Sequence, residues 1–144
     1  MNVALIGAGY WGPNLDRVFF ELPGCNLYTI CDKKKERLDS IKASFPNINT
    51  TQDYRTLLGN SELEAITIAT EAQYHYQITR ECLLSGKHVL VEKPLALSSD
   101  ECKDLIGITK TKNCLLMVEH LLEYHPAVRK LKKLIDNREL GRIY

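Results

Sequence analysis

The feature that most constrains this 144-residue chain is a short apolar run that leads directly into a glycine-rich turn. Residues 3–6 are all apolar, and glycines follow at Gly7, Gly9 and Gly12. A continuous apolar run of this length is typical of a strand that is buried on both faces. Beyond Gly12 the apolar residues recur at helical spacing, which predicts a helix over residues 12–22. This order of strand, glycine turn and helix is the context that a dinucleotide-binding fingerprint requires.

Each glycine has its own physical purpose in such a turn. Gly7 permits the tight turn, Gly9 lets a pyrophosphate approach the backbone, and Gly12 lets the helix pack closely on the strand. Tyr10 and Trp11 complete the turn just before the helix N-terminus, where free N–H groups and the positive end of the helix dipole favour phosphate. The alternative interpretation is a glycine turn that binds no ligand.

An acidic residue follows the next apolar run. Residues 26–31 predict a second strand, and Asp32 comes 20 residues after Gly12. A carboxylate at this spacing accepts hydrogen bonds from an adenosine ribose and repels a 2′-phosphate, so Asp32 favours NAD over NADP. Lys33 and Lys34 support the opposite choice, because they could bind that phosphate. Asp32 could also serve only as a helix cap.

Apolar runs and helical patterns alternate along the rest of the chain. Strands are predicted over residues 65–69, 88–91 and 114–118, with a short edge strand over 48–50. This alternation is typical of an α/β fold, and it predicts one domain over residues 1–144: a doubly wound parallel (Rossmann) sheet of about six strands, with helices on both faces. In such sheets the ligand lies at the carboxyl ends of the strands, where the glycine turn and Asp32 fall.

Two later helices carry clear signals. Ser98 and Glu101 form a capping box, which predicts the start of a helix that extends to about residue 112. Pro126 begins a last helix with a basic face that is expected to be solvated. The apolar faces are predicted to be buried through Leu105, Ile106 and Thr109 in the first of these helices, and through Val128, Leu131, Leu134 and Ile135 in the last.

Composition excludes several classes of function. A net charge of +1 gives no basic surface for nucleic acid or an anionic membrane. The apolar runs are too short for a membrane span, and no leader segment precedes the first strand, so we expect a cytoplasmic protein. The five cysteines and four histidines lack the spacing of a metal site, so we expect free thiols and no metal.

The second informative stretch is Gly86–Ala96, in which Glu92, Lys93 and Pro94 follow a predicted strand. Proline fixes its own backbone angle and biases the preceding residue towards an extended conformation, so Lys93 would be held at a defined angle over the crevice. The alternative is a surface salt bridge beside a turn, which is common for these three residues when they occur alone.

Together, the glycine turn with Tyr10 and Trp11, the Cys31–Asp32 pair and the stretch ending at Pro94 resemble the glucose–fructose oxidoreductase, inositol dehydrogenase and rhizopine catabolism (Gfo/Idh/MocA) family. Residues 117–144 most resemble its nucleotide-sugar branch, which includes UDP-N-acetylglucosaminuronate-type 3-dehydrogenases. The resemblance implies an NAD-dependent dehydrogenase that transfers a hydride between nicotinamide and a secondary alcohol of a sugar or nucleotide sugar. It also implies that Lys93 is the catalytic lysine.

The resemblance further implies a set of cofactor-binding residues. In this set Arg37 would lie near the adenine end of the cofactor. His75 and His120 could be structural histidines rather than cofactor contacts. The implied set is Gly7, Gly9, Tyr10, Trp11, Gly12, Asp32, Arg37, Ala69, Thr70, His75, Glu92, Lys93, Pro94 and His120.

Three departures from the family pattern stand out. Glu71 replaces a proline, and Glu119 replaces a glycine, so either carboxylate could impair cofactor binding. Family members continue into a second domain that binds substrate and through which the enzymes usually associate as homo-oligomers. Residues 143–144 match the start of that domain, so we interpret the chain as the cofactor half of an enzyme. The alternatives are an NAD(H)-binding module without turnover and an empty, truncated remnant.

Overall fold

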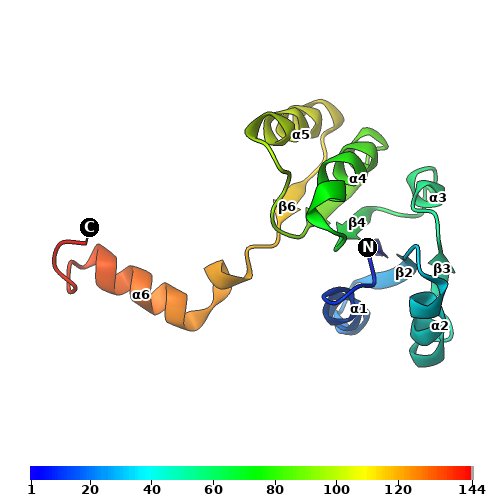
Figure 1. Cartoon of the computed structure of the whole chain (residues 1–144), viewed down its shortest axis with the longest axis horizontal. Helices are drawn as coiled ribbons and strands as arrows, with labels where there is room; N and C mark the ends of the chain where they lie inside the picture. The colour runs from blue at the N-terminus through cyan, green and yellow to red at the C-terminus, as the bar shows by residue number, and fades with distance from the viewer. Residues whose placement is uncertain (144) are drawn as a thin grey trace.

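The computed structural model describes residues 1–143, which form six strands and seven helical segments (Figure 1). The strands are β1 (Asn2–Ile6), β2 (Asn26–Cys31), β3 (Asn49–Thr51), β4 (Ala65–Ile68), β5 (His88–Val91) and β6 (Leu116–Val118). The helices are α1 (Gly12–Glu21), α2 (Lys35–Ser44), α3 (Arg55–Leu58), α4 (Ala72–Leu84), α5 (Ser99–Lys112), the 3-10 helix η1 (Leu121–Tyr124) and α6 (Pro126–Asp136). Tyr144 lies outside the described residues, so part of the second-domain start that we expect at residues 143–144 also lies outside them.

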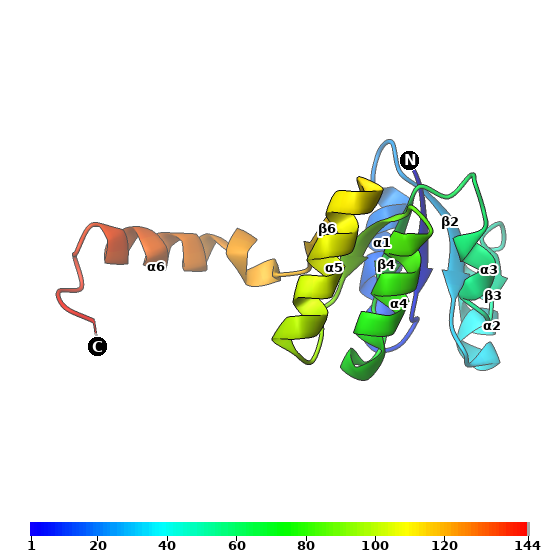
Figure 2. The same cartoon turned by 90° about the horizontal axis from the view of Figure 1, so that it is seen from above.

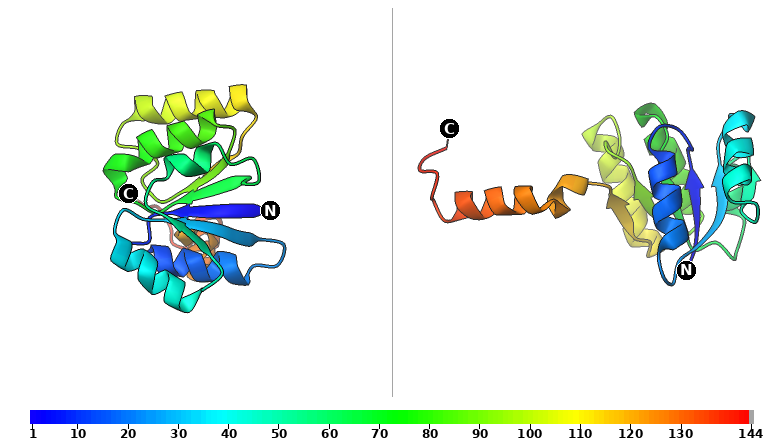
Figure 3. Two further views of the ribbon diagram at one scale, coloured as in Figure 1. Left: turned by 90° about the vertical axis from the view of Figure 1, so that its right-hand side faces the viewer. Right: turned by 90° about the horizontal axis from the view of Figure 1, so that it is seen from below.

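The sheet is parallel throughout, and its strand order is β3-β2-β1-β4-β5-β6. Helices α4 and α5 cover one face, whereas α1 and α2 cover the other (Figure 3, left). This is the doubly wound α/β arrangement that the sequence predicts, and the order reverses between β1 and β4. A crevice therefore opens at the carboxyl ends of these two strands.

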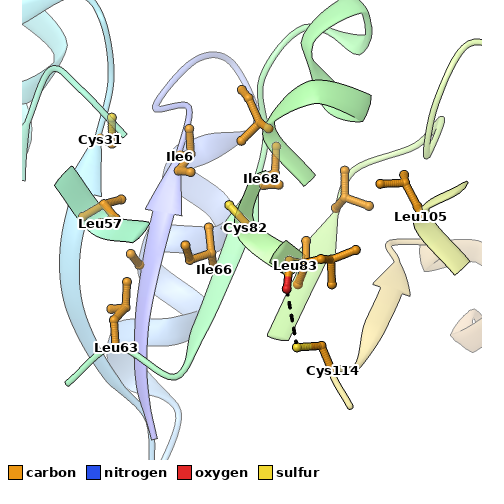
Figure 4. Close-up of a cluster of buried hydrophobic side chains, with 14 of the residues drawn as sticks. Ile6, Cys31, Leu57, Leu63, Ile66, Ile68, Cys82, Leu83, Leu105 and Cys114 are labelled. Carbon is orange, nitrogen blue, oxygen red and sulfur yellow. Dashed lines mark hydrogen bonds between the residues drawn. The ribbon is translucent and has the colours of Figure 1, made fainter. Parts of the chain in front are cut away.

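The larger core lies between the sheet and helices α3, α4 and α5 (Figure 4). Ile66 from β4, Leu83 from α4 and Leu105 from α5 are fully buried there. The Cys114 thiol donates a weak hydrogen bond to the Leu83 carbonyl over 3.9 Å. Continuous apolar strands are needed because both faces of the sheet are covered. The core thus fixes the strand ends that carry the crevice.

Helix α5 begins as its sequence predicts but is rotated slightly relative to the predicted face. The Ser98 hydroxyl accepts from the Glu101 N–H, and the Glu101 carboxylate accepts from the Ser98 N–H, which completes the capping box. Leu105 and Ile108 are buried, whereas Ile106 is 48% exposed. The prediction that Ile106 faces inward was wrong, because positions three apart, not adjacent ones, share one side of a helix.

The prediction of a buried apolar face on the last helix was also wrong. Helix α6 extends away from the sheet (Figures 1 and 2), and Val128, Leu131 and Ile135 are exposed. Leu134 is only partly buried. The cause is η1, which follows β6 and carries the chain outwards, so α6 packs mainly on η1. Over residues 1–143, none of the helices combines the length and apolar character that crossing a bilayer requires.

Candidate functional site

The glycine turn after β1 forms one wall of the crevice. Gly7 has a φ of +101°, and a Cβ there would lie 2.5 Å from the Ala69 carbonyl oxygen, so only glycine fits. A Cβ at Gly12 would lie 2.5 Å from the Gly7 carbonyl oxygen. Gly9 differs, because its Cβ would meet only the Arg37 guanidinium at an ordinary 3.6 Å. The protein itself therefore demands glycine at Gly7 and Gly12, and leaves an open approach to the backbone at Gly9.

Asp32 is 7% exposed and joins this turn to the segment after β2. One carboxylate oxygen, Oδ2, accepts from the Ala8 N–H over 2.8 Å and from Arg37 Nη1 over 3.0 Å. The other, Oδ1, accepts from the Lys34 N–H over 2.8 Å. Helix α2 has Lys34 as its N-cap and no side-chain cap, so Asp32 is not a conventional helix cap. It holds the glycine turn and Arg37 in place at the crevice.

A cavity of about 710 Å³ lies at this edge of the sheet. Its volume is within the range of small-molecule and cofactor sites, about 300–1,000 Å³. The cavity brings together segments from β1, β2, β3 and β4. Its lining includes Gly7, Gly9, Tyr10, Trp11, Asp32, Lys33, Lys34, Arg37, Asp53, Ala69, Thr70, Glu71 and Tyr74.

Cations are placed at the β2–β3 end of the cavity. The Lys33 ammonium lies 4.9 Å from the centre of the Tyr74 ring, a cation–π contact. Arg37 pairs with Asp32, which offsets part of the Asp32 charge. This end of the cavity therefore presents one buried carboxylate together with Lys33, Lys34 and Arg37.

His75 is 1% exposed and links two crevice segments. Its Nδ1 atom lies 2.6 Å from the Pro94 carbonyl oxygen, and its Nε2 atom lies 2.9 Å from the Thr70 carbonyl oxygen. It is not among the described residues that line the cavity. The geometry makes His75 a brace between the β4–α4 connection and the segment after β5, and its expected cofactor contact stays a prediction.

The segment after β5 lies beyond the cavity wall. The Lys93–Pro94 peptide bond is cis, Lys93 and Pro94 are exposed, and the Lys93 N–H donates to the Glu92 carboxylate over 3.2 Å. His120 is exposed after β6. The fold thus brings Glu92, Lys93, Pro94 and His120 to the strand edge that carries the glycine turn, whereas the 710 Å³ cavity does not include them.

Three buried polar atoms around the crevice have no hydrogen-bond partner among the described residues: Trp11 Nε1, Thr70 Oγ1 and Glu119 Oε2. Burial and, after it, the neighbouring Glu92 carboxyl raise the pKa of Glu119 to about 7, whereas the Trp11 indole and Lys93 act in the lowering direction. The sequence identified Glu119 as an unusual residue, but only its position relative to Glu92 and Trp11 shows why it is unusual.

One buried carboxyl was missed by the sequence reasoning. Asp16 on α1 is 3% exposed, and burial raises its pKa to about 7. Its Oδ1 atom has no partner among residues 1–143, and it lines a separate cavity of about 260 Å³ between α1 and α2. Its spacing, four residues after Gly12 and three before Phe19 on the inner side of α1, is the sequence signal that could have found it.

The glycine cradle, the Asp32 brace, the unpartnered Thr70 hydroxyl and a cavity of cofactor size all fit a bound dinucleotide. With the strand order of the sheet, they define a dinucleotide-binding Rossmann domain. An oxidoreductase family model with an NAD-binding Rossmann fold (GFO_IDH_MocA) matches residues 1–120. The chain belongs to this family, as the resemblance implied.

Relatives of known structure or name agree with this assignment. Levoglucosan dehydrogenase from Pseudarthrobacter phenanthrenivorans is 30% identical over 99% of this chain and 39% of its own length. The structure of myo-inositol 2-dehydrogenase from Lactobacillus plantarum matches with a TM-score of 0.89 and 25% identity, over 99% of this chain and 43% of that one. Biliverdin reductase from Synechocystis, solved with biliverdin and NADP+, matches with a TM-score of 0.81 and 29% identity, over 90% of this chain and 42% of that one. The chain thus spans about two fifths of these relatives.

Proposed function

We propose that this chain is the cofactor-binding domain of an oxidoreductase that transfers a hydride between nicotinamide and a secondary alcohol of a sugar or nucleotide sugar. The observation that carries the proposal is the glycine turn, which is closed to side chains at Gly7 and Gly12 but open at Gly9 beside the 710 Å³ cavity. A pyrophosphate needs such an open approach to backbone N–H groups at a helix N-terminus.

The proposed cofactor is NAD. The Asp32 carboxylate lines the cavity after β2, where it would accept hydrogen bonds from a free ribose hydroxyl and repel a 2′-phosphate. Lys33, Lys34 and Arg37 favour NADP instead, and biliverdin reductase is a structural relative that was solved with NADP+. We favour NAD because Arg37 already pairs with Asp32 at 3.0 Å, which leaves Arg37 less available to a phosphate.

The proposed catalytic residue is Lys93. It is exposed at the carboxyl end of β5, on the half of the sheet that would hold the nicotinamide ring when the adenosine lies over β1, β2 and β3. Bound nicotinamide supplies the hydride acceptor or donor. Lys93 would exchange a proton with the substrate hydroxyl, which requires an amine poised near the working pH.

The proposed substrate class rests on the names of relatives. One relative is named for levoglucosan, another for inositol, and both substrates carry secondary alcohols. The nucleotide-sugar branch, with UDP-N-acetylglucosaminuronate-type enzymes, is the finer proposal and rests on residues 117–144.

Turnover would be assayed on the protein as its gene encodes it, with NAD+ and polyols, sugars or UDP-sugars. Lys93→Met should abolish reduction of NAD+ while NADH still binds.

The binding proposal is tested by titrating the chain with NADH and with NADPH while following the fluorescence of Trp11, its only tryptophan. Trp11 lines the cavity, so bound reduced nicotinamide should quench it in a saturable manner, with tighter binding for NADH. Gly9→Ala should fold normally, because its Cβ has ordinary room within the protein, but should block the pyrophosphate.

Gly107→Ala is the matched control, because a Cβ at Gly107 meets open space on α5. This variant should bind as the unaltered chain does. Tighter binding of NADPH than of NADH would instead show that Lys33 and Lys34 bind the 2′-phosphate on the ribose. If neither cofactor binds by fluorescence and by calorimetry, the proposed function is wrong.

A further inference from the structure

The carboxyl ends of three strands bring Trp11, Glu92 and Glu119 together. Trp11 follows β1, Glu92 follows β5 and Glu119 follows β6, so no local sequence pattern pairs them. The backbone positions Glu119 through its N–H, which donates to the Val91 carbonyl over 2.9 Å. The Glu92 carboxyl and the Trp11 indole lie close enough to the Glu119 carboxyl to change its pKa. Glu119 Oε2 and Trp11 Nε1 are nevertheless both buried without a partner among residues 1–143.

The Glu92 carboxylate repels an ionised Glu119 carboxylate, so Glu119 retains its proton more readily than an isolated carboxyl does. The charged groups that act on Glu119 are Glu92 and Lys93, both from the segment after β5, and Trp11 contributes only an N–H dipole. Burial and Glu92 together raise the pKa of Glu119 to about 7.

Glu92 and Glu119 follow β5 and β6, at one side of the crevice. The 710 Å³ cavity extends from the β3 end to the segment after β4 and does not include these two residues. Trp11 links the two places, because it lines the cavity and acts on the Glu119 carboxyl. In a doubly wound sheet each half holds one mononucleotide, so adenosine in the cavity places nicotinamide near this pair. The oxidised ring carries a positive charge, and the reduced ring is neutral. A Glu119 carboxyl that changes charge near neutral pH is therefore positioned to discriminate between the two redox forms.

We propose that Glu119, beside Glu92, is a proton-linked selector for the oxidised cofactor: the oxidised nicotinamide ring displaces the proton of the Glu119 carboxyl, and the reduced ring leaves it bound. This inference rests on the proposed function, because it requires that the dinucleotide binds in this crevice. The binding step balances, since one proton leaves the protein as one positive ring enters. Lys93 lies close enough to act on Glu119, so it partly offsets the charge of the carboxylate that remains after the proton leaves.

The test is to measure the affinity of the chain for NAD+ and for NADH between about pH 6 and about pH 8, where one linked proton with a pKa near 7 changes affinity about tenfold. The affinity for NAD+ should rise about tenfold over this range, whereas the affinity for NADH should stay nearly constant. Calorimetry in buffers of different ionisation enthalpy should show release of a proton with NAD+ and none with NADH. This second measurement uses the unaltered chain and needs no variant.

Glu119→Gln should remove the pH dependence of NAD+ binding. Asp16→Asn is the matched control, because Asp16 also has a pKa raised to about 7 but lines a different cavity, so this variant should keep the pH dependence. Equal pH dependence for the two redox forms, or unchanged dependence in Glu119→Gln, overturns this inference and leaves the proposed function intact. Failure of both cofactors to bind at any pH overturns both.

Discussion

Asp16 should make the protein less stable as the pH rises towards neutrality. The side chain is 3% exposed and its Oδ1 atom lacks a partner among the described residues, so the charged form is poorly solvated. Burial raises its pKa from 3.8 to about 7. A pKa raised on folding means that the folded protein binds the proton more tightly than the unfolded chain does. The resulting stability is complete below about pH 4 and is lost as the pH rises to about 7.

The magnitude follows from the two pKa values. A difference of about 3 pKa units, at about 1.4 kcal/mol per unit, corresponds to about 4 kcal/mol in total. About 3 kcal/mol of this should be lost between about pH 4 and about pH 7, because at the upper limit the folded carboxyl is still half protonated. This is a large fraction of the free energy of unfolding of a domain of this size, about 5–15 kcal/mol.

Urea unfolding of the unaltered chain and of Asp16→Asn at several pH values between these limits measures the effect. The two proteins should have similar stability near pH 4, and Asp16→Asn should become the more stable by about 3 kcal/mol near pH 7. The difference between the two proteins isolates Asp16 from Glu119, whose pKa is raised in the same direction. Asp39→Asn, at an exposed position on α2, is the control and should change little. A constant difference in stability across the pH range would refute the reasoning.

Two further predictions concern the crevice. Gly7→Ala should prevent folding, because a Cβ there would lie 2.5 Å from the Ala69 carbonyl oxygen and the backbone has a positive φ. Gly24 also has a positive φ, but a Cβ there would meet open space. Gly24→Ala should therefore lower the free energy of unfolding, measured with urea, by only about 1–2 kcal/mol. Similar costs for the two variants would contradict the steric argument. His75→Ala should lower the free energy of unfolding by about 2–3 kcal/mol, because it removes the buried ring between the Pro94 and Thr70 carbonyls and leaves unpaired the carbonyl that accepts its N–H, and it should weaken NADH binding. Unchanged NADH affinity in a destabilised His75→Ala would show that the brace does not position the crevice.

The sequence predicts the framework of the site closely because its signals are local. The apolar run of β1 and the glycines that follow specify a strand and a turn within twelve residues, and a Cβ at Gly7 or Gly12 has no room. The capping box at Ser98 acts over four residues and fixes the start of α5. The alternation of such segments then favours a doubly wound sheet, since parallel strands need helical crossovers.

Burial of the helix faces was predicted less well. Helical spacing identifies the apolar stripe of α5, but the rotation that buries Ile108 rather than Ile106 depends on packing against α4. The apolar stripe of α6 is equally clear in the sequence, yet η1 directs the helix away from the sheet and leaves Leu131 exposed. Amphipathic spacing shows which face favours burial, but not the surface against which it packs.

The chemistry of the crevice was decided by the tertiary structure. The sequence by itself determined where Asp32 and Glu119 stand along the chain and that both follow strands. Only the packing of the strands shows that Asp32 holds the Ala8 N–H and Arg37, and that Glu119 meets Glu92 and Trp11 from two other strands. The physical reason is that backbone conformation is governed by neighbours in sequence, whereas hydrogen-bond partners, burial and pKa are set by groups that are distant in sequence and adjacent in space.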